Sequence, residues 1–172
     1  VSSLTSQIVD PADMAGWACE QGYWAPGSGS YYGLISGAAQ AYGFTAEGWS
    51  DWSADSLCRE LASGHLFVAL MGPGHFTSAG HFIVLRGVTL SGKILVADPN
   101  SRERSLTAWE PEVILEELSA SRGSGAPLWR LSLCARRINI NFPLPATAGR
   151  GFFLSTASFS RYKRTSCRPA AG

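Results

Sequence analysis

The sequence lacks long hydrophobic runs. No apolar stretch approaches the roughly 20 residues that a bilayer-spanning helix requires, and the N-terminus has no basic segment followed by an apolar stretch, the pattern of a signal peptide. We therefore expect no membrane span in this chain. Because the first residue is Val1 and not methionine, we expect a fragment or a processed product, so the missing signal says little about the compartment.

Patterns of metal ligands are also missing. The chain has three histidines without an HExxH arrangement, and its four cysteines form no CxxC pair and no cysteine–histidine spacing typical of zinc sites. We expect no metal ion and no organic cofactor. An even cysteine count would permit two disulfides, but small thiols are the favoured interpretation. The four cysteines are Cys19, Cys58, Cys134 and Cys167.

Acidic residues are absent from the C-terminal segment. The whole chain has a net charge of +1, which implies no general attraction to nucleic acid or to an anionic membrane. Residues 1–133 carry all 13 acidic and 7 of the 14 basic residues, a net charge of −6, whereas residues 134–172 carry the other 7 basic residues, a net charge of +7. This division predicts a domain boundary near Leu133. The basic tail has no helical or strand period, so we favour a disordered or non-native extension over a basic interaction arm.

What the chain does have is enough apolar sequence for a core, at 45% hydrophobic and 16% charged residues. Hydrophobic spacing and capping residues predict helices first and strands afterwards, which favours an α+β fold with a mostly antiparallel sheet. The expected helices cover residues 11–21, 31–41, 54–63 and 111–118. The expected strands cover residues 66–71, 81–85, 93–97 and 128–133.

A histidine and an aspartate occupy matching positions in two of these strands. His81 opens one strand and Asp98 follows the next, with a plausible tight turn at residues 90–93 between them. A hairpin of this kind brings both side chains to one end of the sheet, so we expect an imidazole nitrogen about 2.6 to 3.2 Å from a carboxylate oxygen. An aspartate in that place orients the imidazole and stabilises the imidazolium formed when histidine deprotonates a nucleophile. A purely structural histidine is the open alternative.

The segments around these two residues resemble a known family. The runs GHFTSAGHFIVLRGV at residues 74–88 and GKILVADPNS at residues 92–101 look like the His and Asp segments of the bacteriocin-processing (double-glycine leader) peptidase-like family of papain-like cysteine peptidases. The upstream runs VSSLTSQIVDPADMAGWACEQGYW and SADSLCRELASGHLFVALMGPGHFT are similar to its early helices and first core strand. The resemblance covers about residues 1–133 and implies the papain-like fold, with early helices packed on an antiparallel sheet.

The resemblance also implies roles. His81 would be the general base and Asp98 the residue that orients it, while the nucleophile would be a cysteine in a Cys-Gly-Pro-Thr-Ser-type segment and an upstream glutamine would help bind the oxyanion. Neither segment occurs in these 172 residues, and residues 1–5 resemble the helix that follows the cysteine. We therefore expect the chain as given to be inactive. Cys19 and Cys58 lie within expected helices and not at a helix N-terminus, so neither is expected to replace the nucleophile.

Three functional interpretations remain open. The intact parent would hydrolyse peptide bonds by a Cys-His-Asp mechanism, and the alternatives are a peptide-binding module without catalysis and a cell-wall amidase or peptidase on the same fold. The expected partner is a peptide or protein substrate, not a nucleic acid, and the resemblance implies an extracytoplasmic or cell-surface location. His75 would either line the substrate cleft or, as we favour, hold the loop before His81.

Overall fold

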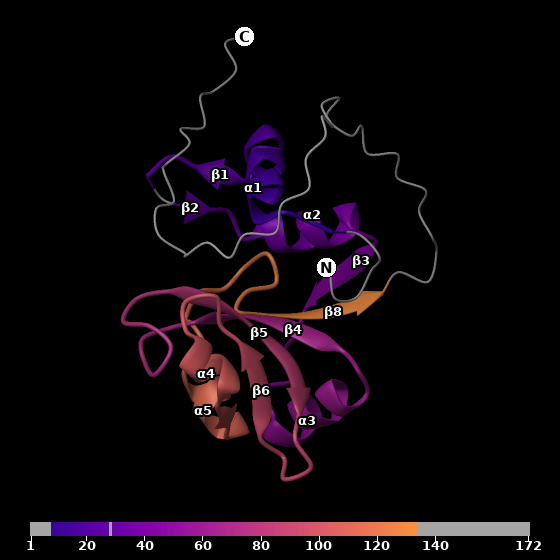
Figure 1. Ribbon diagram of the computed structural model, residues 1–172, viewed down its shortest axis with the longest axis vertical. Coiled ribbons are helices and arrows are strands. Elements are labelled where there is room, and N and C mark those ends of the chain that lie inside the picture. The colour runs from indigo at the N-terminus through magenta and orange to yellow at the C-terminus, as the bar shows by residue number, and fades with distance from the viewer. Residues whose placement is uncertain (1–7, 28, 134–172) are drawn as a thin grey trace, which may run out of the picture. The chain divides into compact units, whose positions relative to one another are not determined.

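A computed structural model of the chain describes residues 8–27 and 29–133 (Figure 1). All of them belong to the unit formed by residues 1–137, and the predicted basic tail at residues 134–172 lies outside the described residues. The helices are α1 (Pro11–Glu20), α2 (Gly33–Ala41), α3 (Ala54–Ala62), α4 (Arg102–Leu106) and α5 (Pro111–Glu116). The strands are β1 (Trp24–Ala25), β2 (Gly29–Ser30), β3 (Phe44–Gly48), β4 (Leu66–Met71), β5 (His81–Val88), β6 (Ile94–Ala97), β7 (Ala108–Trp109) and β8 (Leu128–Leu133).

The sheet is antiparallel throughout the described residues. Its six strands follow the order β3-β8-β4-β5-β6-β7, and every neighbouring pair is antiparallel. The strands β1 and β2 form a separate two-stranded ribbon. The predicted α+β class, with helices packed on an antiparallel sheet, is confirmed.

The predicted helix boundaries have local causes. The Asp10 side chain accepts from the Ala12 amide at 2.7 Å and caps α1, and Ser53 caps α3 by accepting from the Ser56 amide at 3.3 Å. The chain leaves α3 through Gly64 at φ +95°, a conformation that glycine adopts without steric cost. These interactions are local in sequence, which is why capping patterns predicted them.

Several elements differ from the sequence-based expectation. The short strands β1, β2 and β7 were not expected, and β5 continues past residue 85 to Val88. The second helix begins at Gly33 and not at residue 31, because the chain before it forms a tighter turn, in which the Leu34 amide bonds to the Tyr31 carbonyl three residues back at 3.0 Å. The strand β3 was not expected, since its partner β8 comes from the far end of the described chain, with Phe44 paired to Leu133. The short helix α4 was also missed.

Each face of the sheet is covered by different helices (Figure 1). The helices α3 and α5 cover one face, and α2 lies against the other, where Tyr32 and Ile35 pack against the fully buried Trp129. The residues of a strand alternate between these faces. The larger core, under α3 and α5, consists of Leu57, Leu61, Phe67, Ala69, Met71, Phe76, Ile83, Leu85, Ile94, Val96, Ile114 and Leu128.

The hairpin of β5 and β6 determines which residues of the two strands lie at the same end. The strands pair from Val84 opposite Ala97 to Val88 opposite Ile94, and the Thr89 amide closes the turn on the Lys93 carbonyl at 2.8 Å. The first residue of β5 and the residue after β6 therefore lie at the same end of the hairpin, opposite the turn.

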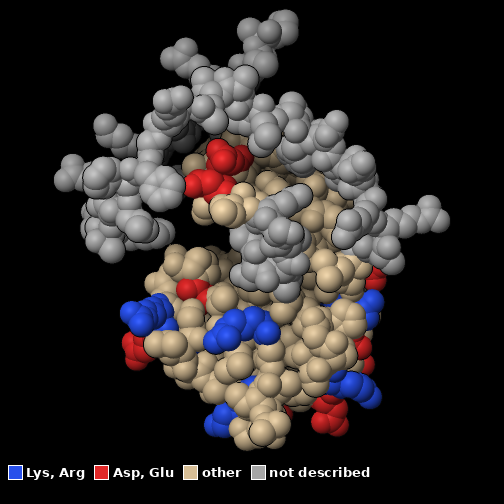
Figure 2. Space-filling view, turned by 45° about the vertical axis from the view of Figure 1, so that its right-hand side comes forward, with Lys and Arg blue, Asp and Glu red and all other residues tan. Residues whose placement is uncertain are grey.

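Basic residues are confined to the later part of the described chain, from Arg59 onwards. No lysine or arginine precedes Arg59 in the sequence. The face in Figure 2 accordingly shows basic side chains only over the part built from the sheet and helices α3 to α5. Among the described helices, none is both long and apolar enough to cross a membrane.

Removing Leu57 from the larger core should destabilise the fold strongly. Leu57 has no exposed surface, so Leu57→Ala is expected to lower the free energy of unfolding by about 2–5 kcal/mol through lost burial and a residual cavity. The matched control is Leu90→Ala in the exposed hairpin turn, which should change it by less than about 0.5 kcal/mol. Chemical denaturation of both variants measures the difference, and equal effects would show that α3 does not pack on the sheet as described.

Candidate active site

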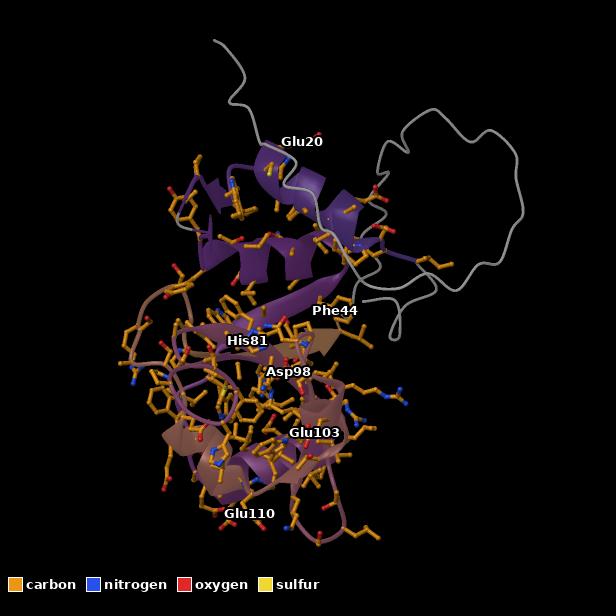
Figure 3. All side chains as sticks on the ribbon, turned by 60° about the vertical axis from the view of Figure 1, so that its left-hand side comes forward. Glu20, Phe44, His81, Asp98, Glu103 and Glu110 are labelled. Atoms are coloured by element: carbon orange, nitrogen blue, oxygen red, sulfur yellow. The ribbon has the colours of Figure 1, made fainter. Side chains whose placement is uncertain are left out.

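His81 and Asp98 are in direct contact. His81 Nε2 donates to Asp98 Oδ1 at 2.8 Å, within the distance expected from the sequence, and the two residues lie beside each other in Figure 3. Continuing the β5–β6 register by one residue past Ala97 puts Asp98 opposite Ile83. His81 lies two residues from Ile83, and therefore its side chain points to the same face of the sheet as that of Asp98. The predicted contact is confirmed.

The Asp98 carboxylate is buried and fully partnered. Its side chain has no exposed surface. Oδ1 accepts from His81 and from the Asn100 amide, each at 2.8 Å, while Oδ2 accepts from Arg104 Nε at 2.5 Å. Burial acts most strongly and raises the pKa of Asp98, but the bonds from Arg104, His81 and Asn100 together outweigh it and leave the pKa below its usual value. Asp98 is therefore ionised at neutral pH.

An ionised Asp98 fixes the tautomer of His81. A carboxylate can only accept hydrogen bonds, so the proton of a neutral His81 ring is on Nε2 and the lone pair is on Nδ1. Asn100 Nδ2 makes a long contact with that nitrogen, at 3.4 Å. The His81 side chain is 12% exposed. Nδ1 is therefore the nitrogen able to take a proton from an incoming group.

The turn after β6 is held by backbone atoms and by helix α4. Asn100 supports Asp98 through its backbone N–H, which donates to Oδ1. The Asp98 amide in turn donates to Ser105 Oγ at 2.8 Å. Arg104 and Ser105 are functional candidates that sequence analysis missed. The sequence did contain a signal for them, since Ser101 is a helix-capping residue. A helix that begins there brings Arg104 and Ser105, three and four residues later, back towards Asp98.

The free thiol among the described cysteines, that of Cys58, does not lie where a nucleophile would have to be. Cys58 is a free, half-buried thiol whose Sγ donates to the Gly92 carbonyl at 3.5 Å, at the turn end of the β5–β6 hairpin. His81 lies at the other end of β5, roughly 23 Å away by the rise of an eight-residue strand. Burial, followed by the charges of Glu112 and Asp55, raises the pKa of the Cys58 thiol, which disfavours the reactive thiolate.

Cys19 is disulfide-bonded. The expectation of small thiols is wrong for this residue, because spacing along the sequence says nothing about which cysteines meet in the fold. A disulfide-bonded sulfur has no proton to give to a base, so Cys19 is not a nucleophile in this structure.

His75 holds the loop that leads to His81. Its amide donates to Glu117 Oε2 at 2.8 Å, and its ring nitrogen Nδ1 contacts Oε1 of the same carboxylate. The ring also packs edge-on against Trp109, with the centroids 5.6 Å apart, and the buried Phe76 packs against the same indole with the ring planes tilted by 48° and the centroids 4.6 Å apart. These contacts agree with the loop-holding role favoured for His75.

Other polar groups of the described chain offer no second centre. His65 contacts Ser63 and Glu60 at the C-terminal end of α3. No group of three or more His, Cys, Asp or Glu side chains in residues 8–27 and 29–133 could hold a metal ion. A shallow cavity of about 200 Å³ lies at the Leu66 end of β4, whereas His81 pairs with Met71 at the opposite end of that strand. The site is therefore the His81–Asp98 pair and its surroundings.

Replacing Asp98 by asparagine should destabilise the fold in a pH-dependent way. The folded-state pKa of Asp98 is lowered, so its contribution to stability is complete above about pH 4 and is lost as the pH falls through the lowered pKa. We expect Asp98→Asn to reduce the free energy of unfolding by about 2 kcal/mol at pH 7. The difference from the unmodified protein should narrow below pH 4. Denaturation at pH 7 and pH 3, with exposed Asp13→Asn as control, measures it, and a pH-independent difference would contradict the assigned ionisation.

Comparison with known proteins agrees with this geometry. Residues 4–118 match the Peptidase C39 like family, a range that covers most of the described chain and both His81 and Asp98. Searches of curated proteins and of solved structures found no match. The match extends over more than half of the 172 residues, and the chain therefore belongs to the Peptidase C39 like family of peptidases with the papain-like fold.

Proposed function

We propose that this domain is the base-bearing part of a cysteine peptidase in which His81 is the general base and Asp98 orients it. The observation that carries the proposal is the 2.8 Å bond from His81 Nε2 to a buried, ionised Asp98. That bond leaves Nδ1 as the proton acceptor, which is the arrangement that nucleophilic catalysis by a thiol needs. Family membership implies a peptide as substrate.

The proposed reaction is acyl transfer. Nδ1 of His81 takes the proton of a cysteine thiol, and the thiolate attacks the carbonyl carbon of the scissile peptide bond. As the carbon–nitrogen bond breaks, the imidazolium gives its proton to the departing amine and an acyl-thioester remains. A water molecule, deprotonated by the same Nδ1, then hydrolyses the thioester. Throughout, Asp98 stabilises the positive ring and keeps it oriented.

We further propose that residues 1–172 contain no nucleophile for this reaction. The described thiol, that of Cys58, is at the wrong end of the hairpin, and the family's Cys-Gly-Pro-Thr-Ser-type segment does not occur in the sequence. In the intact enzyme the nucleophile would come from such a segment placed before Val1. On this hypothesis the finer relationship is to the bacteriocin-processing peptidases. Residues 1–172 alone would be inactive, since loss of one triad member costs several orders of magnitude in rate.

Adding a Cys-Gly-Pro-Thr-Ser-type segment before Val1 should create thiol reactivity and peptidase activity. The 172-residue chain and the extended chain are treated with a thiol-alkylating probe and with leader-type peptides and peptidoglycan fragments. We expect labelling at the added cysteine and hydrolysis of peptides by the extended form only. His81→Ala in that form should abolish hydrolysis and suppress the labelling, because the base is removed.

Cys58→Ala in the extended form is the matched control and should leave both readouts unchanged, since Cys58 lies beside the hairpin turn. If the extended form binds peptides without cleaving them, the domain is a binding module. Cleavage of peptidoglycan fragments alone would indicate a cell-wall peptidase. His81-dependent activity of the 172-residue chain, with Cys58 labelled, would overturn the placement of the nucleophile.

A further inference from the structure

We propose that Arg104 is a positioning residue for the His81–Asp98 pair: it keeps the Asp98 carboxylate ionised and turned so that Oδ1 faces His81. The inference rests on the proposed function and names a residue to which neither the sequence motifs nor the family comparison assigns a role. The observation behind it is that the two oxygens of the Asp98 carboxylate bind different side chains. Oδ1 accepts from His81 Nε2, and Oδ2 accepts from Arg104 Nε at 2.5 Å.

The need for a second partner follows from burial. A carboxylate without exposed surface loses its hydration, which disfavours the ionised form unless charged or polar donors replace the water. The hydrogen bond from Arg104 is the largest of the interactions that lower the pKa of Asp98. His81 cannot serve this purpose alone, because its own charge changes during a proton transfer, whereas a guanidinium stays protonated.

Arg104 is itself held in place. Its amide donates to Ser101 Oγ at 3.1 Å, and its carbonyl accepts from Trp109 Nε1 at 3.0 Å. The Arg104 side chain is 28% exposed, so most of it is packed in the fold. Because the backbone N–H and the carbonyl of Arg104 are both hydrogen-bonded, its side chain leaves the helix from a fixed position towards Oδ2 of Asp98.

The neighbouring Ser105 ties α4 to the backbone of the same aspartate. Its hydroxyl accepts from the Asp98 amide at 2.8 Å and donates to the Ser101 carbonyl at 2.9 Å. Arg86, from β5, donates to the Ser105 carbonyl at 3.3 Å and to the Val96 carbonyl at 2.9 Å. Helix α4 therefore binds Asp98 at two places. Ser105 contacts its backbone amide, and Arg104 contacts its carboxylate.

The chain contains a matched control on the same helix. Arg102 is exposed and makes none of the described contacts with Asp98, so Arg102→Gln removes the same charge from α4 without touching the carboxylate. Arg104→Lys keeps the charge at the buried position. These variants separate the specific contact from the general loss of a positive charge near the site.

The first measurement needs no catalysis. In the 172-residue protein, NMR follows the side-chain carboxyl carbons of the five aspartates, and Asp98→Asn identifies the Asp98 signal by its loss. We expect the pKa of Asp98 to rise in Arg104→Gln, to stay unchanged in Arg102→Gln and to return part of the way in Arg104→Lys. An unchanged pKa in Arg104→Gln, or an equal rise in Arg102→Gln, would overturn the inference.

The second measurement uses the form extended with the cysteine segment. Arg104→Gln should lower kcat/KM about 100-fold, mainly through kcat, because a displaced base is costly while the substrate contacts are kept. The acid limb of the pH profile should move to higher pH, and Arg104→Lys should move it back. If the unmodified extended form is inactive, the proposed function fails and the NMR titration alone decides the inference. A normal kcat/KM in Arg104→Gln would overturn it.

Discussion

The burial of one charged group organises this site. The Asp98 carboxylate has no contact with solvent, and an ionised group in that position is stable only when donors occupy its oxygens. The donors come from three places: the start of β5, the turn after β6, and helix α4. Each of these segments is therefore constrained by the same carboxylate, and a change in any one of them alters the environment of His81.

The hairpin of β5 and β6 determines which nitrogen of His81 is left free of the carboxylate. Because the first residue of β5 and the residue after β6 share one end of the hairpin, Asp98 engages Nε2 of His81 and leaves Nδ1 available. The described thiol of Cys58 is at the other end of the same hairpin. This geometry supports the roles proposed for His81 and Asp98, and it separates the pair from the one free cysteine of the described residues. A thiol that reacts with this base has to approach from the side of Nδ1.

Membership in the Peptidase C39 like family and the local chemistry both support the proposed reaction. Family membership rests on the match of residues 4–118, whereas the proposed chemistry rests on a buried carboxylate with a lowered pKa and on the tautomer that it imposes. Arg104 contributes to the chemistry, since its Nε donates to Oδ2 of the same carboxylate. A carboxylate that must remain ionised while its histidine partner gains and loses a proton benefits from a second cation whose charge does not change. The described cations all lie from Arg59 onwards, in the part of the chain that builds this site.

Short-range patterns determined much of this protein. Capping at Asp10 and Ser53, alternation in the strands and the spacing of His81 and Asp98 around a turn were enough to predict the fold class, most elements and the central contact. These features depend on neighbours in sequence, so the sequence contains them directly. The strand β3, the disulfide at Cys19 and the ion pair of Arg104 were decided by the tertiary structure. The partner of β3 is distant in the sequence and comes near only by folding. The Ser101 cap signals the helix that carries Arg104, but the direction of the Arg104 side chain is set only in the folded chain.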